Sequence, residues 1–303
     1  MKRVLWVTVI VVAMAAVTLG LSGCCCCCPP GGQTSSKVAR NISAGAAHRE
    51  TRQVELGDAD RVEVTIQFGG GELDIEGEGD ELLNATFVYN LDDLEPVIVY
   101  DVQDKQGRLE IRHKLDTIRL DRLVTEIRNE WQIELGKRVP LDIDLDVGAS
   151  NGRIQLGGLR IEELNLTAGA ADMTVGFDEP NPERLTSLRV RSGAARLQLL
   201  ELGNANLDEL TFDGGLGTYT FDFRGEWQRS ANVRIQAGAS QVSLRIPRDI
   251  GVRVCPGDLR RGDYDGLEKE GDCYVNRLYG QSDITLDISL DLGLGKLDIR
   301  QTN

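Results

Sequence analysis

The sequence predicts an all-β protein in which short strands bend at glycines and stack as a β-solenoid or as stacked β-hairpins. Three observations support this prediction. A pattern of two alternating strands around a glycine recurs from residue 60 onward, helical periodicity is scarce, and successive pattern glycines from Gly148 to Gly238 are 21, 24, 22 and 23 residues apart. Such steady spacing is typical of repeat architectures, in which each unit buries its apolar face against its neighbours. Ordinary hairpins in a β-sandwich are the alternative.

Each copy of the pattern has the same internal order of residues. Two apolar residues separated by one spacer precede a glycine, and the same alternation follows it. Alternation with a period of two turns one side of a strand toward the core and the other toward solvent. The glycine permits a positive φ or a close approach to the neighbouring copy. The pattern glycines are Gly69, Gly148, Gly169, Gly193, Gly215, Gly238 and Gly293.

The chain opens with a leader that is first positively charged and then apolar. Lys2 and Arg3 precede an apolar stretch over residues 4–21, and the leader ends in Leu21-Ser22-Gly23-Cys24. This pattern is typical of a bacterial lipobox and predicts a lipoprotein signal peptide over residues 1–23. Lipid attached to Cys24 would anchor the chain firmly. Diacylglycerol supplies two acyl chains and an N-linked acyl group such as palmitate a third, and these chains bury many methylenes. An uncleaved transmembrane anchor is the alternative, since about 18 apolar residues can just span a bilayer.

Both interpretations of the leader place the rest of the chain on the far side of the membrane. Cys25 to Cys28 extend the cysteine run. We interpret them as bystanders, with further acylation or disulfide pairing as alternatives. A metal site is disfavoured, because adjacent cysteines cannot all turn toward one metal ion. The following residues are rich in Pro, Gly, Ser, Ala and Asn and have no apolar period. They predict a lipidated, disordered tether over residues 24–50 that holds the folded part off the membrane.

Composition excludes several classes of function. The 303 residues contain 34 Lys and Arg against 48 Asp and Glu, a net charge of −14, and removing the leader removes two positive charges more. Such an acidic surface repels nucleic acid and anionic lipid headgroups, so we expect no nucleic-acid partner. His48 and His113 are the two histidines, which excludes most zinc and Ser-His arrangements. We expect both to be surface or half-buried residues, and we predict no catalytic, cofactor-binding or metal-binding residue.

Acidic residues occupy the outward positions of some strands. Asp142, Asp144 and Asp146 form one such row, and Asp287 and Asp291 belong to another. Carboxylates in rows can bind calcium, which prefers oxygen ligands. A solvated face that keeps strands from pairing with other chains is the interpretation we favour, with calcium binding as the alternative.

The regular spacing breaks at a cysteine-bounded insert over residues 255–273. In an oxidising compartment Cys255 and Cys273 should form a disulfide. Closing a loop of this length stabilises a fold by about 3 kcal/mol in the chain-entropy account. A redox role is the alternative, but the pair lacks the Cys-x-x-Cys spacing that lowers a thiol pKa. The insert also contains Arg261-Gly262-Asp263, an adhesion-type tripeptide that occurs often by chance.

These motifs resemble a known family. The stretch from Val54 to Ile111, with its run Phe68–Leu73, resembles the N-terminal domain of the toast-rack proteins. Asn129–Leu135 and then Val139–Ile143 resemble the junction that follows in that family. The later repeats are similar to its stacked β-domain and to the C-terminal domain of cell-wall-active antibiotic response proteins. The resemblance implies a toast-rack-like domain over residues 51–136, a repetitive β-domain over residues 137–303, and no catalytic residues to carry over.

Together these features predict a membrane-anchored, extracytoplasmic lipoprotein. We expect a non-enzymatic β-scaffold that presents a binding surface to an envelope protein, with a role in envelope stress by analogy to related response proteins. A polysaccharide-acting enzyme is one alternative, because carboxylates about 5–9 Å apart suit glycosidic cleavage. An aromatic content of 5% argues against an extended sugar platform. A calcium-dependent adhesin is the other alternative.

Overall fold

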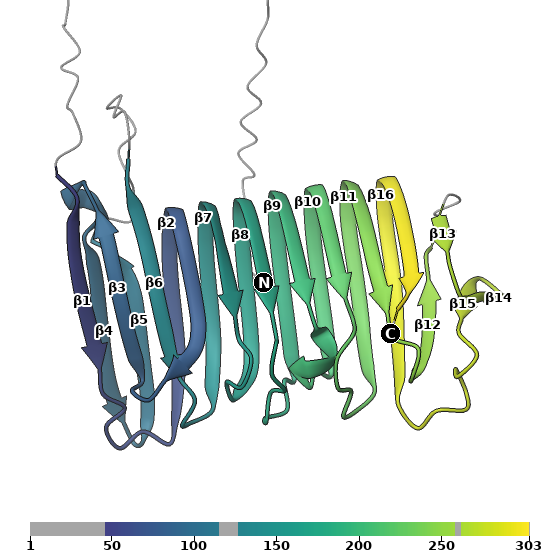
Figure 1. Ribbon diagram of the computed structural model, residues 1–303, viewed down its shortest axis with the longest axis horizontal. Helices are drawn as coiled ribbons and strands as arrows, with labels where there is room; N and C mark the ends of the chain where they lie inside the picture. The colour runs from purple at the N-terminus through teal and green to yellow at the C-terminus, as the bar shows by residue number, and fades with distance from the viewer. Residues whose placement is uncertain (1–45, 115–126, 258–261, 303) are drawn as a thin grey trace, which may run out of the picture. The chain divides into compact units, whose positions relative to one another are not determined.

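The computed structural model describes residues 46–114, 127–257 and 262–302, and these confirm the all-β class (Figure 1). Within these ranges the only helical segments are the 3-10 turns Asp92–Leu94 and Leu202–Ala205. No helix there is long and apolar enough to cross a bilayer. The predicted leader and Cys24 lie outside the described residues.

Sixteen strands form one mixed sheet. They are β1 (His48–Val54), β2 (Arg61–Gly79), β3 (Leu83–Tyr89), β4 (Pro96–Gln103), β5 (Gln106–His113), β6 (Asn129–Gly136), β7 (Leu141–Gln155), β8 (Ile161–Gly176), β9 (Ser187–Leu200), β10 (Glu209–Asp222), β11 (Ala231–Ile246), β12 (Gly251–Cys255), β13 (Gly262–Tyr264), β14 (Glu268–Glu270), β15 (Cys273–Val275) and β16 (Thr285–Gln301).

Seven long strands make up the centre of the sheet. β2, β7, β8, β9, β10, β11 and β16 lie side by side in that order, and each pair of neighbours is parallel. Their registers align the pattern glycines in one column. A Cβ added to Gly148 would lie 2.1 Å from the carbonyl oxygen of Gly69, and one added to Gly293 would lie 3.1 Å from that of Gly238. The column therefore has no room for side chains pointing at the neighbouring strand.

Each long strand bends at its glycine. In β7 the buried side chains before the bend have odd numbers, such as Val147, and those after it have even numbers, such as Ile154. In β10 the rings of Phe212 and Phe221 are 5.0 Å apart, although an extended strand would separate residues nine positions apart by about 30 Å. The strand thus folds back into a first arm and a second arm, whose apolar sides face each other across the core.

The two arms have different neighbours at the ends of the column. At one end the first arm of β2 pairs with β5, and its second arm pairs with β6. β4 pairs with β5 in antiparallel orientation. β3 pairs with β6, and β1 pairs with β3, so these two strands extend the sheet on the side of the second arm. At the other end the first arm of β16 pairs with β12 and the second arm with β13. The domain boundary expected at residue 136 does not interrupt the sheet. β2, which precedes this residue in sequence, pairs along most of its length with β7, which follows it.

Buried asparagines fix the loops that return the chain from one strand to the next. Asn181 accepts hydrogen bonds from the backbone N–H groups of Ile161 and Glu183 and donates to the carbonyl oxygens of Ile161 and Ala205. Asn276 does the same for the loop beside β12. These side chains satisfy backbone groups that the sheet leaves unpaired.

His113 corrects one sequence expectation, because its side chain is only 6% exposed. It continues the inward side of β5 after Leu109 and Ile111, and β6 brings Trp131 against it with ring centroids 4.6 Å apart. His113 Nδ1 lies 3.3 Å from the carbonyl oxygen of Leu94. Burial lowers the pKa of His113, so the neutral ring is the form that the core accommodates. His48, by contrast, is exposed at the start of β1.

The glycine column predicts the sign of one substitution. A Gly→Ala change at a compatible position stabilises a protein by restricting the unfolded chain. Gly148→Ala should instead destabilise the fold by about 2 kcal/mol, because its Cβ meets the Gly69 carbonyl. Chemical unfolding measures this against Ala149→Ser at the exposed neighbouring position, where we expect a change within about 0.5 kcal/mol. Equal or greater stability of Gly148→Ala would contradict the column.

The buried imidazole predicts a dependence on pH. A histidine in the unfolded chain takes up a proton near pH 6.5, but His113 in the folded chain does so only at lower pH. Its contribution to stability is therefore complete above about pH 6.5 and is lost as the pH falls from there toward the lower pKa of the folded state, by up to about 1.4 kcal/mol per pH unit. Unfolding midpoints of the wild type should fall more steeply than those of His113→Gln between pH 7 and pH 5.5. His48→Gln should behave as the wild type, and identical slopes for all three proteins would contradict the assignment.

Candidate interaction surface at the disulfide-bounded end

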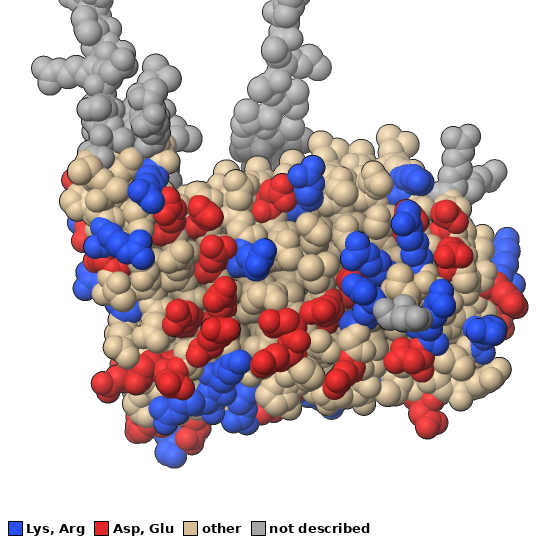
Figure 2. Space-filling model, in the orientation of Figure 1, with Lys and Arg blue, Asp and Glu red and all other residues tan. Residues whose placement is uncertain are grey.

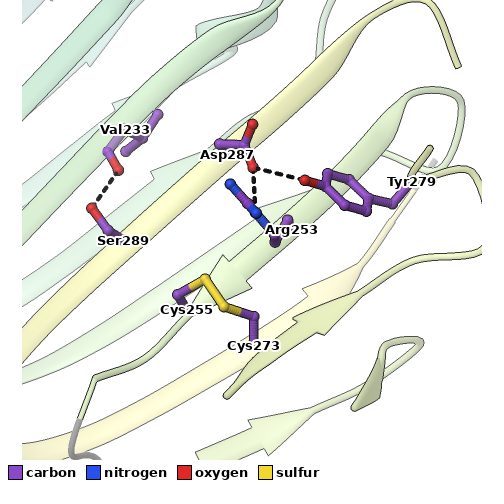
Figure 3. The surroundings of a disulfide bond; sticks show 7 residues. All are labelled: Val233, Arg253, Cys255, Cys273, Tyr279, Asp287 and Ser289. Carbon is purple, nitrogen blue, oxygen red and sulfur yellow. Dashed lines mark hydrogen bonds and ion pairs between the residues drawn. A yellow bond between two sulfur atoms is a disulfide. The ribbon is translucent and has the colours of Figure 1, made fainter. Parts of the chain in front are cut away.

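The insert after β11 ends the sheet with a covalent link. Cys255, the last residue of β12, and Cys273, the first residue of β15, form a disulfide across a sequence separation of 18 residues, with Cα atoms 4.2 Å apart (Figure 3). β15 pairs with β12 on one side and with β14 on the other. The disulfide therefore links β15 to β12, the strand that pairs with the first arm of the last long strand, β16.

The chain order at this end differs from the order in the sheet. β16 lies between β11 and β12 and pairs in parallel with both. After β11 the chain passes over one strand position, forms β12 to β15, and returns to fill that position with its last strand. This insertion brings residues from β10, β11, β16 and β12 together on one outer surface.

A groove of about 400 Å³ crosses these four strands on the outer side of their first arms. Glu209, Asn232, Asp287 and Arg253 stand in one row of the sheet, each on a different strand. The full lining, which we call the groove, is Glu209, Asn232, Val233, Arg234, Arg253, Cys255, Asp287, Ile288 and Ser289. Two acidic side chains, Glu209 and Asp287, and two basic ones, Arg234 and Arg253, belong to this lining.

Arg253 and Asp287 form the charged centre of the groove. Arg253 Nε donates to Asp287 Oδ1 at 2.6 Å, and the guanidinium lies 5.4 Å from the ring centre of Tyr279. The Tyr279 hydroxyl donates to the same carboxylate oxygen at 3.5 Å, as Figure 3 shows. Partial burial, with the nearby charge of Asp287, raises the pKa of Tyr279 and keeps its hydroxyl protonated. The guanidinium, the carboxylate and the hydroxyl of this trio can bind polar groups.

Arg234 offers the groove an additional positive charge. It is exposed on β11 beside Ser289, whose Oγ donates to the Val233 carbonyl at 3.2 Å. In the part of the chain that the structure describes, Arg234 has neither an ion pair nor a hydrogen bond through its side chain. Its guanidinium is thus available to an acidic group from outside.

Tyrosines gather at the same end. Tyr264 of β13 and Tyr274 of β15 stack with ring centroids 3.8 Å apart and planes 2° from parallel. Burial raises the pKa of Tyr264. A second hollow of about 640 Å³ is lined by Arg248, Glu268, Asn276, Arg277, Leu278, Gln281 and Gln301. Both hollows belong to the end that the disulfide closes.

Acidic residues elsewhere serve the fold or face solvent. Asp222 is the single buried Asp or Glu among the described residues. Burial by itself would raise its pKa, but hydrogen bonds from Arg224 and Arg245 outweigh this and lower it. Asp142 pairs with Arg61, while Asp144 and Asp146 are exposed on β7. Within the described ranges no cluster of three His, Cys, Asp or Glu side chains is placed to hold a metal ion.

The sequence identified part of this site. It singled out Cys255 and Cys273, and the structure joins them. Cys24 lies outside the described residues, as does Arg261 of the adhesion-type tripeptide, whose Gly262 and Asp263 belong to β13. The groove was missed because no local pattern indicates that β12 and β16 are neighbours. The repeat alignment alone would have placed Glu209, Asn232 and Asp287 in one row.

The disulfide should stabilise the end of the sheet and leave the centre unaffected. In Cys255→Ser/Cys273→Ser we expect hydrogen exchange in β12 and β15 to lose about 3 kcal/mol of protection, because the insert regains chain entropy when open. Protection in β7 to β9 should not change. Reduced wild-type protein is the matched control and should behave as the double variant does. A uniform loss of protection over the whole sheet would contradict a local role.

Solved structures to which this chain is similar come from several bacteria. A candidate cell adhesion protein from Clostridium sporogenes is 24% identical, covers 84% of this chain and 100% of its own, and has a TM-score of 0.46. A candidate adhesin from Bacteroides fragilis is 11% identical, with coverages of 86% and 100% and a TM-score of 0.33. A candidate lipid binding protein from Parabacteroides distasonis is 11% identical, with coverages of 86% and 99% and a TM-score of 0.33. No curated protein matches the chain.

The family comparison covers more than half of the sequence. The model described as the N-terminal domain of toast_rack, DUF2154, matches residues 43–185 and again residues 179–245. It extends past residue 136, into repeats that the sequence resemblance assigned to a second domain. The bent strands β2 and β7 to β10 lie in the matched region, as does β11 except for its last residue. The chain therefore belongs to the toast-rack family defined by this N-terminal domain.

Proposed function

We propose that the protein is an exported lipoprotein, anchored through Cys24, whose β-sheet serves as a non-enzymatic scaffold for an envelope protein partner. The Cys255–Cys273 disulfide is the observation that carries this proposal. The other five cysteines lie together at residues 24–28, so both cysteines of the folded region are paired. Disulfides persist outside the cytoplasm, which agrees with the lipobox-type leader.

The chemistry of the groove favours a protein partner. Small-molecule sites are mostly apolar with a few polar groups. The groove reverses this proportion, since Glu209, Arg234, Arg253 and Asp287 supply charges of both signs. Fixed charges of both signs favour specificity through complementary charges on a partner. Arg234 would engage an acidic side chain, and a basic group would contact Glu209.

Finer points of architecture belong to the same proposal. We infer that the bent strands are successive coils of a β-solenoid, with residues 51–136 as the toast-rack-like domain and residues 137–303 as the repetitive domain. Parallel, in-register stacking of the pattern glycines supports the solenoid. A role in envelope-stress responses extends the resemblance to response proteins and rests on analogy.

One experiment tests the anchor and the scaffold together. The full-length gene is expressed in a bacterium with an alkyne fatty acid and a photoreactive residue at Ser289 in the groove. We expect lipid label on the wild type, none on Cys24→Ala, and a discrete crosslink to an envelope protein that Arg234→Glu weakens. The photoreactive residue at Gln241, which is exposed on the second arm of β11, is the matched control and should give no such crosslink.

Three outcomes would overturn parts of this proposal. Lipid label that persists on Cys24→Ala would remove the anchor. Equal crosslinking from positions 289 and 241 would remove the groove as the binding surface. Turnover of peptidoglycan or another glycan by the purified mature protein would replace the scaffold with an enzyme.

A further inference from the structure

The bends of the seven long strands lie in a row along one side of the stacked strands. We call this row of turns the bend edge. It consists of residues 69–71, 148–150, 169–171, 193–195, 215–217, 238–240 and 293–295, and every one of them is Gly, Ala, Ser or Leu. The strands turn there in Figure 1, and where grey atoms do not cover the corresponding upper edge of Figure 2, its outermost atoms are tan, with charged side chains just below them. An uncharged edge is unexpected in a chain with 27% charged residues.

Two leucines project from this edge. Leu216 is 59% exposed and Leu294 is 76% exposed, which makes them the two most exposed large apolar side chains among the described residues. Leu216 is aligned with Ala194 of β9, and Leu294 with Ala239 of β11. Two strand spacings, about 10 Å, separate the leucines. Neither packs in the core, so their apolar surface is available to an apolar environment outside the protein.

The chain enters its folded region at the same edge. His48, the first residue of β1, pairs with Tyr89, which pairs with Asn129. The Asn129 carbonyl oxygen lies 2.1 Å from where a Cβ of Gly71 would be, so this row of residues meets the bend edge at β2. The predicted disordered tether would span about 27 Å on average between Cys24 and His48. A lipid at Cys24 would therefore hold the bilayer, on average, closer to the bend edge than to the loops at the opposite edge.

We propose that the bend edge docks on the surface of the bilayer in which the Cys24 lipid is inserted, with Leu216 and Leu294 entering the headgroup region. This inference rests on the lipid anchor of the proposed function. Tethering supplies a high effective concentration, so a shallow apolar contact suffices to orient the sheet.

Charges beside the bend edge define the kind of lipid surface. The exposed charged residues next to the bends are five acidic and three basic ones: Asp146, Arg191, Asp213 and Asp291 on the first arms, and Glu72, Asp172, Arg196 and Lys296 on the second arms. The acidic excess opposes anionic headgroups. Docking therefore relies on apolar contact with neutral lipid. The groove lies at the far ends of the first arms, so this orientation leaves it open to a partner.

Environment-sensitive probes test the orientation on the anchored protein. The lipidated chain, with Cys25 to Cys28 replaced by serine, carries a nitrobenzoxadiazole label at Leu216→Cys or Leu294→Cys. Gln228→Cys, in the exposed loop after β10, places the same label at the opposite edge. Each protein is reconstituted into phosphatidylcholine vesicles that contain a headgroup-proximal spin-labelled lipid. We expect a blue shift and lipid quenching at positions 216 and 294, and neither at position 228.

Each alternative result has a separate meaning. Protein that floats with the vesicles without quenching at 216 or 294 overturns docking and leaves the anchor intact. Protein that fails to float with Cys24 present overturns the anchor itself. A blue shift that needs high protein concentration but no vesicles assigns the bend edge to contact between two copies of the chain, and equal quenching at position 228 shows that the sheet has no fixed orientation.

Discussion

The structure depends on how closely seven strands approach one another at their bends. A strand can fold back in the middle and still pair with neighbours that do the same only if the backbones stack directly at the turn. Glycine meets that requirement because a Cβ at Gly148 or Gly215 would lie within 2.1–2.4 Å of a carbonyl oxygen of the previous strand. The column of glycines thus sets the register, and the register places every side chain on its face.

The other surfaces follow from that register. Apolar residues on both sides of each glycine face one shared core, and polar residues occupy the outer sides of the two arms. The bend edge is left with small uncharged residues and two leucines, while the opposite edge carries loops fixed by buried asparagines. The proposed partner-binding groove and the proposed membrane contact therefore lie on different parts of one sheet. The same residues that permit the fold keep these two surfaces apart.

The sequence predicted what depends on local pattern. Alternation around Gly148 and its equivalents is visible within about 20 residues, so the strands and the aligned bends could be inferred. Three features depend on pairing between distant segments and could not be. β16 lies between β11 and β12 in the sheet. β5 and β6 pair with different arms of β2. The ring of Trp131 packs against that of His113. The groove was missed for the same reason, although Cys255 and Cys273 marked the end where it lies.

The central claim is that each repeat is one strand folded back on itself and stacked on its predecessor through glycine. Nuclear Overhauser effects in the folded region test it most directly, because they report proton pairs that are close in space. The account predicts contacts between the ring protons of Phe212 and Phe221, together with contacts between the α-protons or amide protons of Gly193 and Gly215. Clear contacts between sequence neighbours along each strand but none between these pairs would contradict it.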